Sequence, residues 1–280
     1  MKKLISVIIV LSLFVICFSA CDITASGAGN LKIKYKISDG EAIVTGVPDN
    51  ATVPEIVIPD EYDGYPVTEI ADFSIVNLEN VTRVTIGKNV KTIGLWAMEN
   101  NKRLTYIEVD DENQYFSDVD GVLFTKDMTT LLFYPMARGV EEMKTAEGDT
   151  VKGISYSIPE GVETVRTKAF YKCSDIRELT LPESLKAIEE KAFFRCSISE
   201  ITLPEKLEFI GKDAFSYCAG LKSIVIPASV REIGEYAFYN CTALLDITVN
   251  SKESDLILGK NWQPTNNGLK INDLKITWKE

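Results

Sequence analysis

Histidine is absent from the 280 residues of this chain. Histidine is the side chain most often used for proton transfer near neutral pH and the commonest metal ligand in proteins. Its absence excludes Ser-His and Cys-His nucleophile pairs. Catalysis by carboxylates alone stays open.

Positive charge is also scarce. The chain has 30 Lys and Arg against 41 Asp and Glu, a formal net charge of -11, and no basic cluster. Nucleic-acid binding needs a positive surface to displace counterions, so we expect no nucleic-acid partner. An acidic surface favours solubility and cationic partners or divalent ions. The apolar share of 45% is ordinary for a folded protein and argues against disorder.

The N-terminus predicts export. Lys2 and Lys3 precede an apolar stretch over 4–18, which is shorter than the roughly 20 residues of a spanning helix and typical of a secretory signal. The stretch ends in Phe18-Ser19-Ala20-Cys21, which resembles a bacterial lipobox. We therefore expect a lipoprotein signal peptide and lipobox over 1–21, lipidation of Cys21 and attachment to a membrane. Plain secretion and an uncleaved anchor are the alternatives. Small residues over 22–30 predict a flexible tether.

A repeat of about 23 residues dominates the second half of the chain. An Ala-Phe pair is followed, three residues after the Phe, by a cysteine. The structural repeat residues are Ala169, Phe170 and Cys173; Ala192, Phe193 and Cys196; Ala214, Phe215 and Cys218; and Ala237, Phe238 and Cys241. An Ile-Pro or Leu-Pro step recurs in the same rhythm at Pro159, Pro182, Pro204 and Pro227. A fixed period of this length predicts a solenoid, in which each unit buries its apolar face against its neighbours.

One clean unit runs over 227–249. Its end, with Leu244, Ile247 and Val249, predicts a short strand, because side chains alternate between the two faces of a strand. Gly234 allows a tight bend, and we expect the Ala-Phe segment to form one helical or 3₁₀ turn with the Phe ring inside. The same template fits two earlier segments, so six units are predicted. The predicted divisions are an N-terminal β cap over 31–58, leucine-rich repeats 1 and 2 over 59–109, a β-hairpin insertion over 110–157, repeats 3 to 6 over 158–250 and a C-terminal cap over 251–280.

Three Asp-Gly steps predict turns. Asp120-Gly121 lies between extended runs and indicates a hairpin within the insertion. Asp39-Gly40 suggests a β-rich N-terminal cap, and Asp63-Gly64 a bend within the first unit. Trp262 and Trp278 lie in the predicted C-terminal cap, which would cover the last coil.

The repeat resembles the BspA-type leucine-rich repeats of bacterial surface proteins over roughly 37–249. The motifs that carry the resemblance are the Ile-Pro step, Ile-Gly-x-x-Ala-Phe-x-x-Cys, and Asp-Gly-Val-Leu-Phe followed by Tyr-Pro. Arg166 and Glu189 depart from it by replacing the bend glycine in two units, and the fourth unit is one residue short after Cys196. The resemblance implies a β-rich leucine-rich repeat solenoid on an exported, surface-displayed binding or adhesion protein.

The four repeat cysteines share one position of the unit, which Asn101 occupies in the second unit. We expect four free, buried thiols, with a disulfide between neighbouring units as the alternative. A Cys₄ zinc site needs converging ligands, and a straight ladder does not converge. Asp118 and Asp120 resemble the start of a calcium loop, but no Glu closes it. No metal or cofactor is expected.

The outward face of the predicted strands offers a candidate ligand-binding surface of carboxylates and hydroxyls suited to sugar hydroxyls, cationic peptide or ions. Its candidate residues are Glu178, Thr180, Glu200, Thr202, Ser223, Val225, Asp246 and Thr248, and the first two units add Arg83, Thr85, Tyr106 and Glu108. An inert sheet face is the alternative. Tyr171, Phe194 and Tyr239 form a further column that either packs between coils or offers an apolar contact site.

These patterns predict a lipid-anchored cell-surface recognition or adhesion module that binds a host or matrix protein, or a glycan, through its strand face. A structural spacer or coat protein without a specific ligand is the alternative. A carboxylate-based glycan-active enzyme is disfavoured, because Glu178 and Glu200 would be neighbours on an open sheet without the enclosing pocket that raises the pKa of one of them. We expect no catalytic residues.

Overall fold

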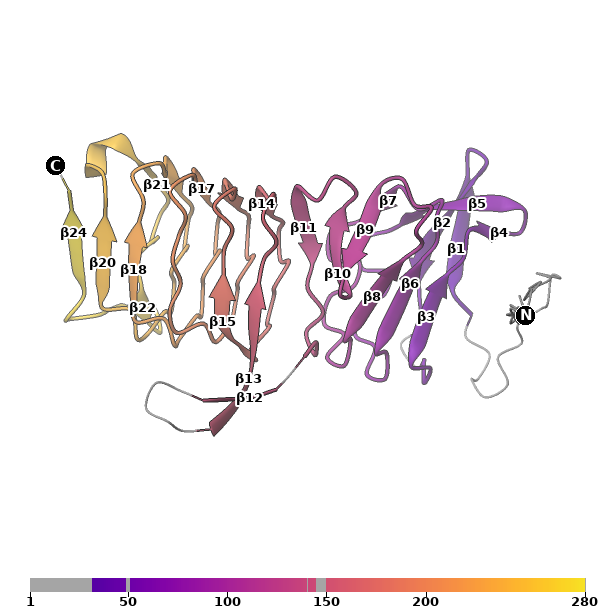
Figure 1. Cartoon of the computed structure of the whole chain (residues 1–280), viewed down its shortest axis with the longest axis horizontal. Helices are drawn as coiled ribbons and strands as arrows, with labels where there is room; N and C mark the ends of the chain where they lie inside the picture. Colours follow the sequence, from indigo (N-terminus) through magenta and orange to yellow (C-terminus); the bar gives the residue numbers. More distant parts are fainter. Residues whose placement is uncertain (1–31, 49–50, 140, 145–149, 280) are drawn as a thin grey trace, which may run out of the picture.

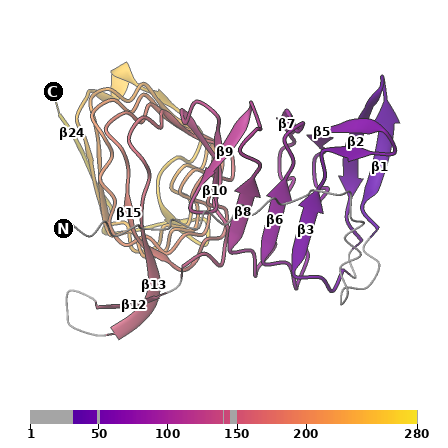
Figure 2. The same cartoon turned by 45° about the vertical axis from the view of Figure 1, so that its right-hand side comes forward.

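The computed structural model describes residues 32–48, 51–139, 141–144 and 150–279. The predicted signal peptide, Cys21 and the tether lie outside these ranges. The described chain forms an elongated array of stacked coils (Figure 1). In a view turned by 45°, the C-terminal coils are seen almost end on while the N-terminal strands still lie side by side (Figure 2). The array therefore changes direction near its middle.

One side of most coils is a strand of a parallel sheet, and the coil of Glu200 contributes a single bridge there; we call this side the strand wall. Its N-terminal part consists of β3 (Glu55–Ile58), β6 (Arg83–Ile86) and β8 (Tyr106–Val109). Its C-terminal part consists of β13 (Thr150–Ser157), β15 (Ile176–Thr180), β18 (Ser223–Ile226), β20 (Asp246–Val249) and β24 (Lys275–Trp278). Ile224 and Ile226 are buried while Ser223 and Val225 point outward, as the alternation predicts.

A second wall is built from very short strands that follow the bend of each coil. It contains β14 (Thr164–Val165), β16 (Ala187–Ile188), β17 (Phe209–Ile210), β19 (Glu232–Ile233) and β21 (Ile257–Leu258), all paired in parallel. In the N-terminal part, β5 (Tyr65–Ile70) pairs with β7 (Thr92–Ile93) in the same way. Each coil pairs with its neighbour through only two residues on this wall, so these strands mainly hold the position of the bend that follows them.

The third side, which we call the turn edge, is formed by the Ala-Phe segments. They make consecutive turns with bonds from residue i+3 to i, for example Ala237 N to Gly234 O at 3.2 Å and Cys241 N to Phe238 O at 3.2 Å. Tyr236 and Asn240 have φ of 58° and interrupt each turn. Each Ala-Phe segment therefore forms 3₁₀-type turns, one of the two expected alternatives, without extending into a helix. The 3₁₀ helix among the described residues is η1 (Glu253–Asp255) in the C-terminal cap.

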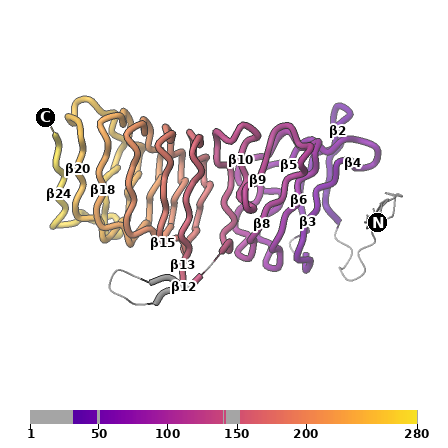
Figure 3. Tube along the Cα trace, viewed as in Figure 1, coloured from indigo at the N-terminus to yellow at the C-terminus, as the bar shows by residue number. Residues whose placement is uncertain are grey.

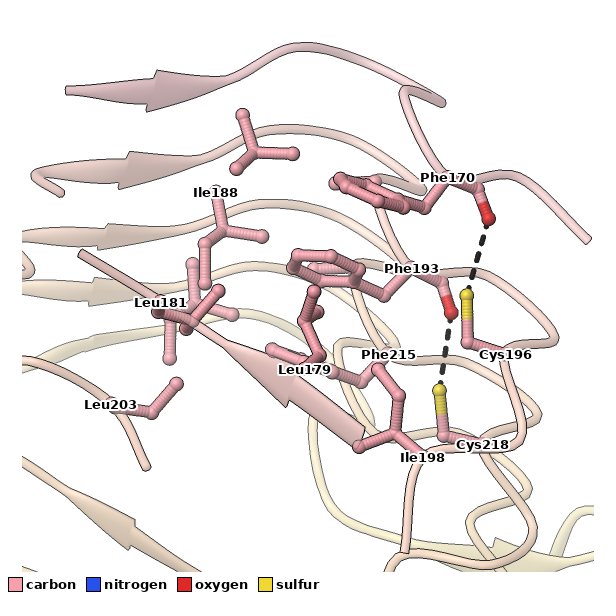
Figure 4. Packing of buried hydrophobic residues seen from close by; sticks show 14 of the residues in the cluster. Phe170, Leu179, Leu181, Ile188, Phe193, Cys196, Ile198, Leu203, Phe215 and Cys218 are labelled. Atoms are coloured by element: carbon pink, nitrogen blue, oxygen red, sulfur yellow. Dashed lines mark hydrogen bonds between the residues drawn. The ribbon is translucent and has the colours of Figure 1, made fainter. Parts of the chain in front are cut away.

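The phenylalanines of the Ala-Phe pairs form the centre of the core. Phe170, Phe193, Phe215 and Phe238 are all 0% exposed, and their ring centroids are 5.2, 5.3 and 5.4 Å apart in succession. Figure 4 shows the first rings of this column against the strand-wall side chains. Burying each ring stabilises the fold by roughly 1.5–3 kcal/mol. Each ring does so only against the coils next to it.

The cysteines beside this column are free and buried, as predicted. The thiol of Cys196 donates to the Phe170 carbonyl oxygen at 3.1 Å, and that of Cys218 to the Phe193 oxygen at 3.1 Å (Figure 4). Asn101 Nδ2 donates to the Ile75 oxygen at 2.7 Å in the corresponding position. Burial raises the pKa of the Cys218 thiol to about 12. The thiols therefore act as neutral hydrogen-bond donors that tie each coil to the one before it.

The predicted hairpin insertion joins the second wall. β9 (Phe116–Val119) and β10 (Val122–Thr125) pair across the Asp120-Gly121 turn, whose φ values of 51° and 79° define a two-residue hairpin loop. β11 (Thr130–Phe133) pairs with β10 and, in parallel, with β14. Val122 packs into the C-terminal core and Leu123 into the N-terminal core. The insertion is thus a sheet buried on both faces between the two halves of the array.

A second hairpin and two caps complete the fold. β12 (Glu141–Lys144) pairs with β13 and projects away from the array (Figure 3). The N-terminal cap holds β1 (Lys34–Ser38) and β2 (Glu41–Gly46), and β4 (Glu61–Tyr62) forms a hairpin with β5 where a simple bend was expected. The C-terminal cap contains the β22 (Thr265–Asn266) and β23 (Leu269–Lys270) hairpin.

The bend glycines are required by the close stacking of coils. A Cβ on Gly211 would lie 2.6 Å from the Glu189 carbonyl carbon and 2.8 Å from the Glu190 nitrogen of the preceding coil. Arg166 occupies the same position beside the insertion, where it has room to reach back and donate from Nη2 to the Ile93 oxygen at 3.2 Å. In the next coil the carboxylate of Glu189 accepts bonds from the Thr167 nitrogen and hydroxyl at 2.9 and 3.0 Å. The two departures from glycine therefore lie next to the break in the repeat.

We expect Gly211→Ala to lower the free energy of unfolding by about 1–3 kcal/mol, because the new methyl overlaps the backbone of the preceding coil. Gly220→Ala, in the same unit, is the control, since its Cβ would approach no atom closer than 3.4 Å. Urea denaturation followed by circular dichroism measures both. Equal stability of the two variants would contradict close stacking as the reason for the bend glycine.

Candidate functional site

The outward face of the C-terminal strand wall, which we call the strand face, carries two columns of side chains. In the first column Ser155 pairs with Glu178, Glu178 bridges to Glu200, and Ser223 pairs with Asp246. The second column contains Ser157 and Thr180, then Thr202, Val225 and Thr248. All eight candidate residues lie on this face. They are exposed, except Thr248, which is half-buried.

The structure adds residues to both ends of these columns that the sequence pattern did not predict. Ser155 and Ser157 belong to β13, inside the segment expected to be the insertion, and Lys275 and Thr277 belong to β24, inside the segment expected to be the cap. The alternation of Ile154, Tyr156 and Ile158 with polar residues was the available signal for β13. Lys275 pairs in register with Asp246, so a basic residue follows the acidic column at its C-terminal end.

The carboxylates of the first column have no partners among the described residues. The side chains of Glu178, Glu200 and Asp246 make no hydrogen bond or ion pair with that part of the chain. Glu178 and Glu200 are direct neighbours of like charge on adjacent coils. Such pairs destabilise a sheet, so these two carboxylates lower the stability of the folded protein instead of contributing to it.

On the same face of the N-terminal block, whose strand wall consists of β3, β6 and β8, two charged side chains are paired with each other. Arg83 Nη1 lies 3.1 Å from Glu108 Oε2, and its guanidinium carbon lies 4.4 Å from the centroid of the Tyr106 ring. The Thr85 hydroxyl lies between two acceptors, a Glu55 carboxylate oxygen at 3.3 Å and a Glu108 carboxylate oxygen at 3.4 Å, and can donate its one hydrogen to either. These groups bind one another, whereas the carboxylates of the C-terminal block face solvent alone.

A hollow of about 560 Å³ opens at the end of this N-terminal face, where β3, β6 and β8 give way to their loops. Its lining includes Glu55, Asp60, Glu108, Asp110 and Asp111 together with Val57, which is 52% exposed. The hollow therefore extends the acidic character of the strand wall into the N-terminal block.

The turn edge carries a second set of aligned side chains. Tyr171, Phe194 and Tyr239 are half-buried, and the first two stack with ring centroids 5.1 Å apart. Tyr217 connects Phe194 to Tyr239, with centroids 5.3 and 5.7 Å away. The sequence pattern did not include Tyr217 because it occupies the next position of its unit. The column therefore packs along the coils and still shows part of each ring to solvent.

A narrow slot lies between the two halves of the array on this edge. Trp96 and Glu99 face Lys168 and Tyr171 across it, and the space for small molecules is about 30 Å³. Trp96 Nε1 is buried there with no acceptor among the described residues. The space holds roughly one or two waters, so the slot is too small for a sugar or a peptide.

Other chemistry finds little support in the described residues. None of their His, Cys, Asp and Glu side chains form a group of three placed to hold a metal ion. The carboxylate of Asp118, which begins the calcium-like loop of the sequence, accepts from Val109 N at 2.8 Å and Gly121 N at 3.4 Å and so supports the hairpin. Within the same ranges, no helix has the length and apolar character to cross a bilayer.

Comparison with known families agrees with this architecture. The model of the BspA type leucine-rich repeat region matches residues 49–124 and 149–257 with six copies. The chain belongs to this family. Six copies equal the number of units that the period predicts. No curated protein matches the chain.

Solved structures confirm the fold of this BspA-type protein. The pneumococcal vaccine antigen PcpA is similar with a TM-score of 0.60 at 22% identity, over 81% of this chain and 63% of that one. A leucine-rich repeat protein from Eubacterium ventriosum has a TM-score of 0.52 at 22% identity, over 69% of this chain and 56% of that one. This chain thus spans less than two thirds of either protein. The likeness shows a leucine-rich repeat solenoid of a bacterial type.

We expect Glu200→Gln to raise the free energy of unfolding slightly, by at most about 0.5 kcal/mol, because it removes repulsion from Glu178 that solvent already screens. Glu108→Gln is the matched control, since Glu108 is paired with Arg83 and its loss should not stabilise the protein. Urea titration at low ionic strength measures both. Loss of stability in Glu200→Gln would show that the carboxylate has a structural partner.

Proposed function

We propose that this protein is a lipid-anchored recognition or adhesion module of the cell surface, which binds a protein or glycan ligand through its strand face. The observation that carries the proposal is the unpaired column of Glu178, Glu200 and Asp246, flanked by hydroxyl side chains. Groups that destabilise the free protein and lack internal partners are typical of a surface that meets another molecule.

The chemistry of the face favours a ligand with cationic groups. Carboxylates about one coil apart accept hydrogen bonds from lysine and arginine side chains, and the neighbouring Thr180 and Thr202 hydroxyls donate or accept. A basic segment of a host or matrix protein fits this surface best. Contact would be shallow and spread over several coils, which favours modest affinity.

Anchoring and location complete the proposal. Cys21, after lipidation, would hold the array to a membrane through the tether over 22–30, and the acidic charge would keep the array soluble. The family and its structural neighbours are leucine-rich repeat proteins of bacteria, one of which is described as a pneumococcal vaccine antigen. We propose no enzymatic activity, because Glu178 and Glu200 lie on an open, exposed sheet.

We expect the full protein, purified from membranes in detergent, to give a saturable interaction in a screen of immobilised matrix proteins, mucins and a glycan array. Glu178→Lys/Glu200→Lys should weaken binding of a positively charged ligand by at least about tenfold, because the introduced lysines repel its basic groups. Surface plasmon resonance measures the affinity.

The matched control is Glu205→Lys/Glu208→Lys, which reverses two exposed carboxylates outside the columns. It should bind almost as well as the unchanged protein. A folded protein that binds nothing in the screen would favour the spacer or coat function, and equal loss in both double variants would show that only net charge matters.

Lipidation is tested separately. We expect radiolabelled palmitate to enter the protein in a bacterial host and Cys21→Ala to abolish the label, because the thiol is the acceptor in a lipobox. The membrane fraction should lose the protein at the same time. Unchanged labelling of Cys21→Ala would contradict the anchor, and membrane retention without label would indicate an uncleaved leader.

A further inference from the structure

The aromatic column of the turn edge is part of a longer chain of contacts. Phe73 and Trp96 are in contact with ring centroids 4.6 Å apart in the N-terminal block. Lys168 Nζ then lies 4.5 Å from the Trp96 ring and 4.7 Å from the Tyr171 ring. The ammonium group therefore joins the aromatic residues of the two halves across the break in the repeat. From Tyr171 the column continues through Phe194 and Tyr217.

Two further cations lie on these rings. Lys172 Nζ is 4.9 Å from the Tyr171 ring, and the Arg195 guanidinium carbon is 5.6 Å from the Phe194 ring and 5.0 Å from the Tyr217 ring. Contact with a ring face holds a cation in place without neutralising it. The edge thus presents charged groups whose positions are set before any ligand arrives.

These cations differ in their pairing with carboxylates. Lys168 is bound to Glu99 at 2.9 Å, with side chains 16% and 20% exposed. Lys172 and Arg195 form no ion pair with the described residues, and Arg195 is exposed. Arg195 retains N–H donors for a carboxylate or sulfate.

The alignment of these cations favours an extended anion over a compact one. The cations follow one another along the array axis, on coils whose stacked rings are 5.1 and 5.3 Å apart. An extended polymer with acidic groups along its length would meet several coils at once. A linear polysaccharide has sugar units comparable in length to this spacing, and its hydroxyls suit the phenols of Tyr171 and Tyr217. We propose that the turn edge binds a linear anionic polysaccharide, through Lys172 and Arg195 in particular.

This site is independent of the proposed strand-face function, because its cations Lys172 and Arg195 lie on the turn edge. The test uses the full protein in detergent and immobilised hyaluronate and chondroitin sulfate, with neutral dextran as a blank, at an ionic strength of about 0.15 M. We expect saturable binding to one or both acidic polymers that weakens as salt is added. Lys172→Glu/Arg195→Glu should weaken it by about 100-fold, roughly tenfold per lost charged hydrogen bond.

Three variants show whether binding belongs to the turn edge, to the net charge or to the strand face. Lys222→Glu/Lys275→Glu makes the same change in net charge at exposed lysines of the strand-wall side and should bind normally. Arg195→Lys keeps the charge and should retain most of the affinity. Glu178→Lys/Glu200→Lys should not weaken polysaccharide binding. The turn-edge proposal can therefore be judged even if the proposed strand-face function proves wrong.

Several outcomes would overturn the proposal. They are absence of binding to both acidic polymers, equal weakening by Lys172→Glu/Arg195→Glu and Lys222→Glu/Lys275→Glu, and binding of single-stranded DNA as tightly as of the polysaccharides. Equally tight binding of single-stranded DNA would show that the protein attracts any polyanion without recognising a polysaccharide. Unchanged binding in Lys172→Glu/Arg195→Glu would show that these cations serve only the packing of the edge.

Discussion

The structure depends on one constraint: the backbone of each coil must lie directly on the backbone of the coil before it. Carbonyl and amide groups bond from coil to coil along the turn edge, as between Phe215 N and Ala237 O at 2.8 Å. Only a small number of side chains fit between such closely stacked backbones. Glycine at the bend, phenylalanine in the interior and cysteine at the last turn repeat because each coil presents the same space to the next.

This stacking also organises the surface. Residues at one position of the unit become a column with the spacing of the coils, so a chemical group that recurs in the sequence becomes an array of that group. The strand face collects carboxylates and hydroxyls in this way, and the turn edge collects rings with cations on them. Two chemically different surfaces therefore lie on different sides of the same coils, and each extends over several of them.

The insertion shows what happens when the stacking is interrupted. The sheet of β9, β10 and β11 replaces a regular coil and stays buried because both of its faces are apolar, with Val122 and Leu123 packing into opposite cores. Beside it the bend glycine is no longer needed, and Arg166 and Lys168 cross the gap instead. The array changes direction here, and its two halves carry differently paired charges on the strand face.

The sequence by itself determined the solenoid, the six repeats that the family also counts, and the buried positions of Phe170 and Cys196, because a fixed period leaves one way for successive units to bury their apolar residues. It also determined the Asp120-Gly121 hairpin, because the turn is local. It could not place β13 or β24 in the strand wall, since neither follows the period, nor decide between an α-helical and a 3₁₀ turn at the Ala-Phe pair. Only the tertiary structure decided which charges are paired: Glu108 finds Arg83 while Glu178 and Glu200 find no partner among the described residues, and Lys168 meets Trp96 from 72 residues away in the sequence. Such pairings depend on distances between coils, which the order of residues along the chain does not contain.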